Sequence, residues 1–389
     1  MNKAEEKLLL EVLSLPTAPF REDHVKSRAI TFLQALHIPH FEDPIGNIVI
    51  GCDNATRYKR LLNSRSTEPV RLFIAHMDHP GYHGVRWLDN TRLLAKWHGG
   101  SPVKLLRGSN VWLGDASREL GRGKITKSIL AKHGHSMDSL EISFPRQLFQ
   151  NGNRPRATGL FGGFIFRSAL WTQRRRIYTR AADDLAGVFC ILATAAAWHR
   201  QPASKQTPFI GLLTRGEEVG FVGAVGHFEL GWLTAARRPL CAISLEASRT
   251  LPGALIGHGP VLRQGDRRTV FNNDYLQVLS QVAQKHLAGK HQKRVMDGGA
   301  CEGTASTAYG IATIGMSVPL GNYHNEGFEG GPDCRGFRGP APECIHLDDV
   351  AGELLLCKKL LAPGLLWDRP WEGVRKQLRQ RLRHYRSLL

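Results

Sequence analysis

The sequence contains 389 residues, of which 42% are hydrophobic. That content is enough to fill a sizeable core, which excludes a disordered chain. The formal net charge is +18, but apart from Arg174–Arg176 and the C-terminal run the cations are dispersed, which argues against specific nucleic-acid binding. No stretch approaches the roughly 18 consecutive apolar residues of a membrane helix, so we predict no membrane span.

The seven cysteines are scattered along the chain and form no CxxC pair. This pattern indicates neither a disulfide framework nor a thiolate metal site. A reducing compartment fits it best, and we predict a cytoplasmic location.

The N-terminal part predicts two amphipathic helices and then two strands. Apolar residues recur every three or four positions in residues 4–13 and 24–36. Residues 47–50 (NIVI) and 70–75 (VRLFIA) are short apolar runs of the kind expected for strands, and the second is typical of a buried strand.

The sequence between residues 85 and 178 has a different texture, with many glycines, short apolar runs and no long helical period. It predicts a small inserted domain that is mostly β. The alternation of helices and strands then resumes. We predict helices at residues 186–198, 275–286 and 347–361, and strands at residues 209–214, 240–245 and 313–318.

This alternation predicts an α/β fold with a mostly parallel sheet and helices on both faces. We predict a catalytic domain formed by residues 1–84 and 179–370, interrupted by the insertion of residues 85–178. Residues 371–389 form a third part, a basic amphipathic helix, because four apolar residues recur at helical spacing: Val374, Leu378, Leu382 and Tyr385. Its basic face is either simply solvated or binds an acidic partner or a membrane surface.

Five segments place a side chain that can bind a metal just beyond a predicted strand or at a helix start, where open α/β sheets build their sites. The candidate ligands are His76, Asp183, Glu218, Glu246 and His324. Two histidines with several carboxylates and no cysteine suit zinc, with cobalt or manganese as alternatives.

We predict two divalent ions, about 4 Å apart, with the Asp183 carboxylate as the bridge between them. His76 with Glu246 or Glu218 would complete one shell, and His324 with the remaining carboxylate the other. Asp78 lies two residues after His76, so in an extended chain its carboxylate accepts a proton from the ring's other nitrogen.

The consecutive pair Glu217-Glu218 predicts a division of labour. One carboxylate binds a metal while its neighbour stays free to take a proton from the attacking water. We predict that Glu217 is this general base and that it later returns the proton to the leaving nitrogen.

Several motifs occur in the order and with the separations of a known family. They are LLLEVLSLPTAPFREDHV, DPIGNIVIG, AHMDHPG, AADDLAG, EEVGFVGA and VPLGNYHNEG. In these the chain resembles the co-catalytic zinc aminopeptidases, and most closely the glutamyl-aminopeptidase or tetrahedral-aminopeptidase family, over nearly all of its length outside the insertion and the basic tail.

The resemblance implies a metal-dependent aminopeptidase that acts on peptides and forms homo-oligomers, with the insertion as a small β domain that restricts access. It places the five candidate ligands on metal positions and Glu217 on the base. Asp78 and Asp184 fall on positions that support the ligands.

Three departures make the chain a divergent member. Leu185 follows the two aspartates where the closest family usually has arginine, and Glu246 stands where it usually has aspartate. Residues 298–304 read GGACEGT instead of a GGTDA-like segment, which leaves the substrate preference open.

Other interpretations of single residues stay open. Asp183-Asp184 is also typical of a helix N-cap, and a buried Glu246 could instead pair with a basic residue. Glu302 is either a helix-start carboxylate or a contact for a substrate ammonium group. Arg249 and Arg263 are expected at the surface, with recognition of an anionic substrate as the alternative.

Two other functions compete with the aminopeptidase. One is a zinc carboxypeptidase or N-acyl amino-acid deacylase, and the other is a catalytically silent binding scaffold of the same fold.

Overall fold

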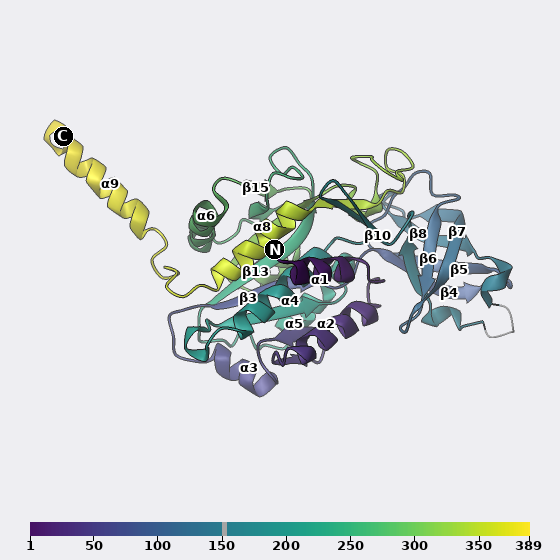
Figure 1. Ribbon diagram of the computed structural model, residues 1–389, viewed down its shortest axis with the longest axis horizontal. Coiled ribbons are helices and arrows are strands. Elements are labelled where there is room, and N and C mark those ends of the chain that lie inside the picture. Colours follow the sequence, from purple (N-terminus) through teal and green to yellow (C-terminus); the bar gives the residue numbers. More distant parts are fainter. Residues whose placement is uncertain (150–153) are drawn as a thin grey trace.

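The computed structural model describes residues 1–149 and 154–389 (Figure 1). Its centre is an eight-stranded sheet in the order β1-β2-β12-β3-β13-β16-β14-β15. The strands are β1 His40–Glu42, β2 Ile48–Ile50, β3 Val70–His76, β12 Phe209–Thr214, β13 Leu240–Arg249, β14 Val261–Asp266, β15 Gln292–Met296 and β16 Thr313–Leu320. The four central strands β12, β3, β13 and β16 are mutually parallel.

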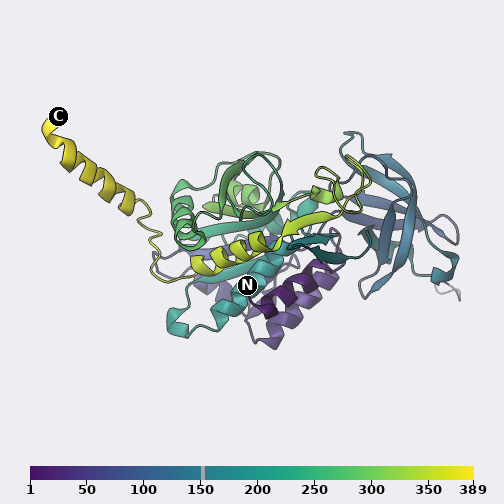
Figure 2. The same ribbon diagram turned by 45° about the horizontal axis from the view of Figure 1, so that its top comes forward.

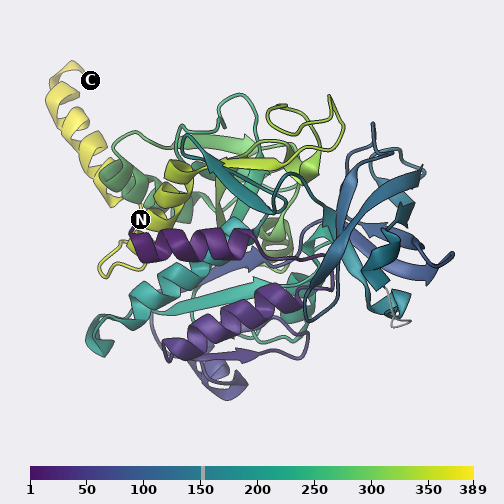
Figure 3. The same cartoon turned by 45° about the vertical axis from the view of Figure 1, so that its right-hand side comes forward.

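Helices cover both faces of this sheet, because its buried strands are apolar on both sides. On β3, Phe73 and Ala75 belong to one core cluster and Leu72 and Ile74 to the other. The first cluster is covered by α1 Lys3–Leu13, α2 Asp23–Ala35, α4 Leu185–His199, α6 Asn273–Leu287 and α8 Leu347–Leu360, and the second by α3 Ala55–Leu62, α5 Val222–Glu229 and α7 Glu302–Ala308. Figure 3 shows α1 and α2 in front of the sheet. The predicted α/β class is confirmed.

A closed antiparallel barrel lies at one end of the molecule (Figure 2). Its strands pair in the order β4-β5-β8-β7-β6-β9. They are β4 Gly81–Trp87, β5 Arg92–His98, β6 Asn110–Gly114, β7 Glu119–Leu130, β8 Met137–Ser143 and β9 Phe161–Phe164. Alternating residues point inward: Leu93, Ala95 and Trp97 of β5 are all buried in the barrel core.

The strands that follow the barrel belong to a separate three-stranded sheet. Strands β10 Leu170–Gln173 and β11 Arg176–Thr179 pair with each other, and β11 pairs with β17 Glu343–His346. The barrel strands therefore run from Gly81 to Phe164, whereas the predicted insertion covers residues 85–178. The division into domains stays a prediction.

The last helix, α9 Glu372–Tyr385, projects away from the body of the protein (Figures 1 and 2). No residue of α9 is buried. Within the described residues, no helix is both long enough and apolar enough to cross a membrane.

Candidate metal centre and active site

The candidate ligands gather at the carboxyl ends of the central strands of the sheet. The register pairs Thr214 of β12 with His76 of β3, and Glu246 of β13 with Ser317 of β16. Because the strands are parallel, their carboxyl ends lie side by side, which is where ligand sites form in open α/β sheets. His76 is the last residue of β3, and His324 lies four residues after the end of β16.

Two groups of side chains place their potential ligand atoms within 4.8 Å of one another. The first consists of His76, Asp183 and Glu246, and the second of Asp183, Glu218 and His324. Asp183 is common to both groups. A third group joins His76 to Glu217 and Glu218, which places the predicted base beside the ligands.

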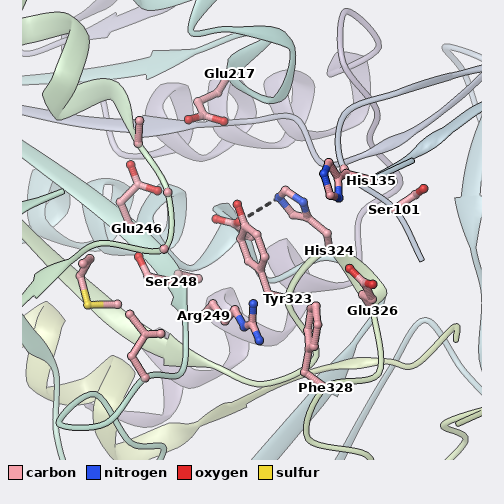
Figure 4. Close-up of a pocket in the computed structure, with 18 of the residues that line it drawn as sticks. Ser101, His135, Glu217, Glu246, Ser248, Arg249, Tyr323, His324, Glu326 and Phe328 are labelled. Atoms are coloured by element: carbon pink, nitrogen blue, oxygen red, sulfur yellow. Dashed lines mark ion pairs between the residues drawn. The ribbon is translucent and has the colours of Figure 1, made fainter. Parts of the chain in front are cut away.

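The distances within these groups are short. His76 Nε2 lies 3.5 Å from Asp183 Oδ1, and His324 Nε2 lies 3.6 Å from Asp183 Oδ2 and 3.0 Å from Glu218 Oε2. The two histidines therefore approach opposite oxygens of one carboxylate. Figure 4 shows His324, Glu217 and Glu246 around the same pocket.

Burial concentrates negative charge in this site. It raises the pKa of Glu217 and Glu218 well above the ordinary value, and the repulsion of each from neighbouring carboxylates adds to that. Burial lowers the pKa of His76, yet Glu217, Asp183 and Asp78 outweigh it, and the net shift is upward. Burial lowers the pKa of His324 to about 4, so its imidazole is neutral at neutral pH, the form that binds metals.

The donor atoms fit a divalent cation. Asp183 Oδ1, Glu218 Oε1 and His324 Nε2 are buried and have no hydrogen-bond partner among the described residues. Buried polar atoms are nearly always paired, so three unpaired atoms on the side chains of one candidate group point to a cation that would satisfy them. Oxygen and imidazole nitrogen ligands without thiolates are those of zinc and similar ions.

Glu217 and Glu218 lie on a 3₁₀ turn, Glu217–Val219, that follows β12. Gly216 and Gly220 flank it with φ of 59° and 111°, in the left-handed region that favours glycine. The Asp78 carboxylate accepts the backbone N–H of Glu217 at 3.0 Å and of Glu218 at 3.1 Å. Asp78 thus fixes the turn that carries both glutamates.

This arrangement differs from the predicted role of Asp78. His76 Nδ1 lies 3.0 Å from the main-chain oxygen of Asp78, whereas the nearest carboxylate oxygen is 3.6 Å away. Strand β3 ends at His76, so the side-chain alternation of a strand does not fix the position of Asp78. The carboxylate oxygens are used by the two amides instead.

Glu22 supports the same turn and was not predicted. Its carboxylate accepts Gly216 N–H at 3.1 Å and Arg215 Nε at 2.8 Å. Burial, together with repulsion from Asp78, raises the pKa of Glu22 to about 7 despite its pairing with Arg215. Only the place of Glu22 in the motif LLLEVLSLPTAPFREDHV could have pointed to this role, because Arg215 and Gly216 lie nearly 200 positions further along the chain.

Asp184 and Glu302 are fully buried, and neither lines the pocket. Asp184 Oδ1 accepts Gly187 N–H at 3.0 Å and caps α4, the alternative that the sequence left open. Glu302 begins α7, is fully buried and bonds the hydroxyl of Thr214. Burial raises the pKa of Glu302 to about 8. Because Glu302 does not line the pocket, its position favours the helix-start role over contact with a substrate ammonium group.

The prediction that Arg263 lies at the surface is wrong. Its side chain is buried, and Nη1 lies 3.8 Å from Glu246 Oε1. Gly315, its partner on β16, leaves the room: a Cβ there would lie 3.3 Å from Arg263 Cβ. Glu246 therefore faces both a candidate metal site and a basic residue. Arg249 is exposed as predicted and stacks on Phe328 at 3.8 Å.

The site opens into a pocket of about 340 Å³ to which the barrel contributes. Ser101 and His135, from the loop after β5 and the turn between β7 and β8, line it beside His324 (Figure 4). Gly100 lies against the His324 ring, where a Cβ would come within 2.0 Å of Nδ1. Sequence reasoning assigned none of these barrel residues to the site.

Glu343 at the start of β17 joins the two halves of the site, and it too was not predicted. One carboxylate oxygen accepts Ala182 N–H at 2.6 Å and Asp183 N–H at 3.3 Å. The other accepts His324 N–H at 2.9 Å and lies 3.1 Å from His79 Nε2. One fully buried side chain therefore fixes the backbone of both Asp183 and His324.

Comparison with known proteins agrees with this geometry. Residues 163–327 match the model of the M42 glutamyl aminopeptidase family. This segment contains Asp183, Glu217, Glu218, Glu246 and His324. The chain is a metallopeptidase like the M42 glutamyl aminopeptidases. The resemblance read from the sequence is thereby confirmed. No curated protein matches the chain.

Solved structures share the fold over almost the whole chain. The Pyrococcus horikoshii TET1 peptidase is 19% identical with a TM-score of 0.69, and the match covers 92% of this chain and 99% of that one. An aminopeptidase from the archaeon Desulfurococcus kamchatkensis is 20% identical with a TM-score of 0.70, covering 95% and 98%. A TET aminopeptidase from a marine sediment thaumarchaeon is 17% identical with a TM-score of 0.70, covering 95% and 99%.

The position of Glu343 predicts that its carboxylate is needed for high metal affinity. Glu343→Gln replaces one accepting oxygen by an amide that cannot accept the N–H groups of Asp183 or His324. Losing such a support typically costs about 10- to 100-fold in metal affinity. Competition titration with a chelating dye should show this loss while the melting temperature changes little. Glu6→Gln, an exposed change of the same chemistry, should have no effect, and equal metal affinity in both variants would refute the role.

Proposed function

We propose that the protein is an aminopeptidase that removes N-terminal residues from peptides with the help of two divalent ions. The observation that carries this proposal is the sharing of Asp183 by two groups of ligand atoms beside Glu217. A carboxylate shared between two cations reduces their mutual repulsion. In this assignment one ion is held by His76, Asp183 and Glu246, and the other by Asp183, Glu218 and His324.

Zinc is the proposed metal, with cobalt or manganese as alternatives, because the ligands are imidazoles and carboxylates. The bound ions would lower the pKa of water and polarise the scissile carbonyl. Glu217 lines the pocket and belongs to neither assigned ligand set. It would accept the proton of the attacking water and pass it to the leaving nitrogen. The Asp78 carboxylate holds Glu217 in place by accepting the backbone N–H of Glu217.

The pocket walls favour an aminopeptidase over a carboxypeptidase. Glu217, Glu246 and Glu326 all line the pocket, so a free ammonium group meets acidic side chains near the ligands. Three arginines line the same pocket: Arg338 pairs with Glu326, Arg263 lies 3.8 Å from Glu246, and Arg249 stacks on Phe328. A carboxypeptidase or deacylase would use such cations for a substrate carboxylate instead. Against a silent scaffold stands Glu217, which a binding protein has no need to keep beside the ligands.

Restricted access to the pocket and homo-oligomerisation are further parts of this proposal. Ser101 and His135 bring the barrel to the pocket wall, which supports our prediction that it narrows the entrance against folded proteins. The Pyrococcus horikoshii TET1 peptidase can assemble into a tetrahedron or a large octahedral shell. We extend homo-oligomerisation to this chain as part of the proposal, and a cytoplasmic location stays a prediction.

The dinuclear assignment predicts that two ions bind per chain. Removing the metal with a chelator should abolish cleavage, and zinc titration of the apoprotein by calorimetry should saturate at two equivalents. His324→Ala should leave one tight site, since His76, Asp183 and Glu246 remain. Saturation of the wild-type chain at a single ion would disprove the shared carboxylate.

The role of Glu217 predicts a separation of binding from chemistry. Glu217→Gln should keep its metal content yet lose about a hundredfold to ten-thousandfold in kcat, because proton transfer contributes that much. Glu218→Gln is the matched control and should lose metal affinity as well. Near-normal turnover of a fully metallated Glu217→Gln enzyme would be incompatible with this role.

The choice of substrate end is tested with one short peptide in two blocked forms. Acetylation of its amino terminus should abolish cleavage, because no ammonium group remains to meet the acidic wall. Amidation of its carboxyl terminus should matter little. Cleavage is followed by mass spectrometry, and the reverse pattern would assign the protein to the carboxypeptidase or deacylase class.

A further inference from the structure

We infer that α9 is a membrane-surface helix that binds anionic phospholipid headgroups and lies in the plane of the bilayer. This inference is independent of the catalytic assignment. It begins from the isolation of the helix: α9 follows the segment 361–371 and projects away from the body in Figures 1 and 2. Its apolar side chains are open to solvent, and Leu378, Leu382 and Tyr385 are each 55% exposed.

A helix of this length needs a surface to lie on. Isolated helices shorter than about 12 to 15 residues are marginal in water, and α9 has 14 residues. Most helical stability in proteins comes from packing of an apolar face, which α9 does not obtain from the described body. An external surface would supply that packing.

The apolar residues form a narrow seam. At about 100° per residue, Val374, Leu378, Leu382 and Tyr385 fall within an arc of about 80°. Arg381 lies just beyond one side of this arc, and Arg375 just beyond the other. Arginines in these positions can extend their guanidinium groups to the headgroups while the leucines enter the acyl boundary. Such an arrangement is typical of interfacial helices.

The charge identifies the kind of surface. Residues 372–389 contain six lysines and arginines and one acidic residue, Glu372, which already pairs with Arg369 at 3.4 Å. A second copy of the chain carries a net charge of +18 and would repel this helix on average. An anionic leaflet attracts it, because each cation near the surface adds to the attraction. Nucleic acid would use the cations but not the leucine seam.

Vesicle co-sedimentation of the full-length protein tests the inference. It should pellet with vesicles of phosphatidylcholine containing about 30 mol% phosphatidylserine and remain in the supernatant with phosphatidylcholine alone. Raising NaCl from about 0.1 M to about 0.5 M should weaken binding, because the attraction is screened.

Two double variants separate the seam from simple charge. Leu378→Asp with Leu382→Asp should reduce vesicle affinity by about tenfold or more, because it removes the apolar contact. Gln377→Asp with Gln380→Asp adds the same charge outside the seam, at about 60° and about 120° from its edge, and should retain much more of the binding. Both pairs lie on a helix that buries nothing, so the melting temperature should stay that of the wild-type protein.

Three outcomes would overturn the inference. Equal loss in both double variants would show attraction by charge alone, without insertion of the seam. Equal binding to neutral vesicles would remove the charge argument. Failure to bind anionic vesicles, with binding to an acidic protein or to polynucleotides instead, would assign α9 to another class of partner.

Discussion

The structure depends on holding several carboxylates together in a buried site. Asp183, Glu217, Glu218 and Glu246 meet at the carboxyl ends of the central strands, where His76, His324 and Arg263 offset part of their charge. Burial and mutual repulsion both favour protonation of such groups, and the pKa values of the glutamates rise accordingly. Divalent cations reverse this balance, because they stabilise the ionised form of every carboxylate that they touch. The same crowding that is costly for the bare chain therefore favours the binding of cations.

A second set of buried acids holds the first set in place, through backbone amides and not through packing alone. Asp78 accepts the amides of the Glu217-Glu218 turn, Glu22 accepts that of Gly216, and Glu343 accepts those of Asp183 and His324. Charge-assisted bonds of this kind are shorter and stronger than neutral ones, so the loops have little freedom. The ligands thus gain fixed positions from loops that glycines would otherwise leave mobile.

Much of this could be predicted from the sequence where the signal is local. The strand Phe209–Thr214 has the predicted bounds, because it is an uninterrupted apolar run. The short helices α5 and α7 were missed, since each is only seven or eight residues long and contains glycine. The five candidate ligands were proposed because each follows a strand or begins a helix, and the structure brings their side chains together, while their role as ligands stays a prediction.

Residues whose roles depend on distant partners were beyond local patterns. Arg263 is buried beside Gly315, a residue 52 positions later in the chain that pairs with it on the neighbouring strand. Glu343 and Glu22 act on loops about 160 and 190 residues away in the chain. Asp78 was predicted to support His76, yet its carboxylate accepts the amides of the turn after β12, a pairing that depends on the sheet order. Local sequence patterns thus indicate which residues can bind a metal or carry a charge. The partner that a buried charged side chain contacts depends instead on the topology of the fold.

The elongated shape of the molecule separates the barrel from α9. The barrel, which reaches the pocket with Ser101 and His135, lies at one end, and α9 projects from the other (Figures 1 and 2). Binding of α9 to a bilayer would therefore use the end of the molecule opposite the barrel. Attachment through α9 and the barrel's contribution to the pocket would thus depend on separate parts of the chain.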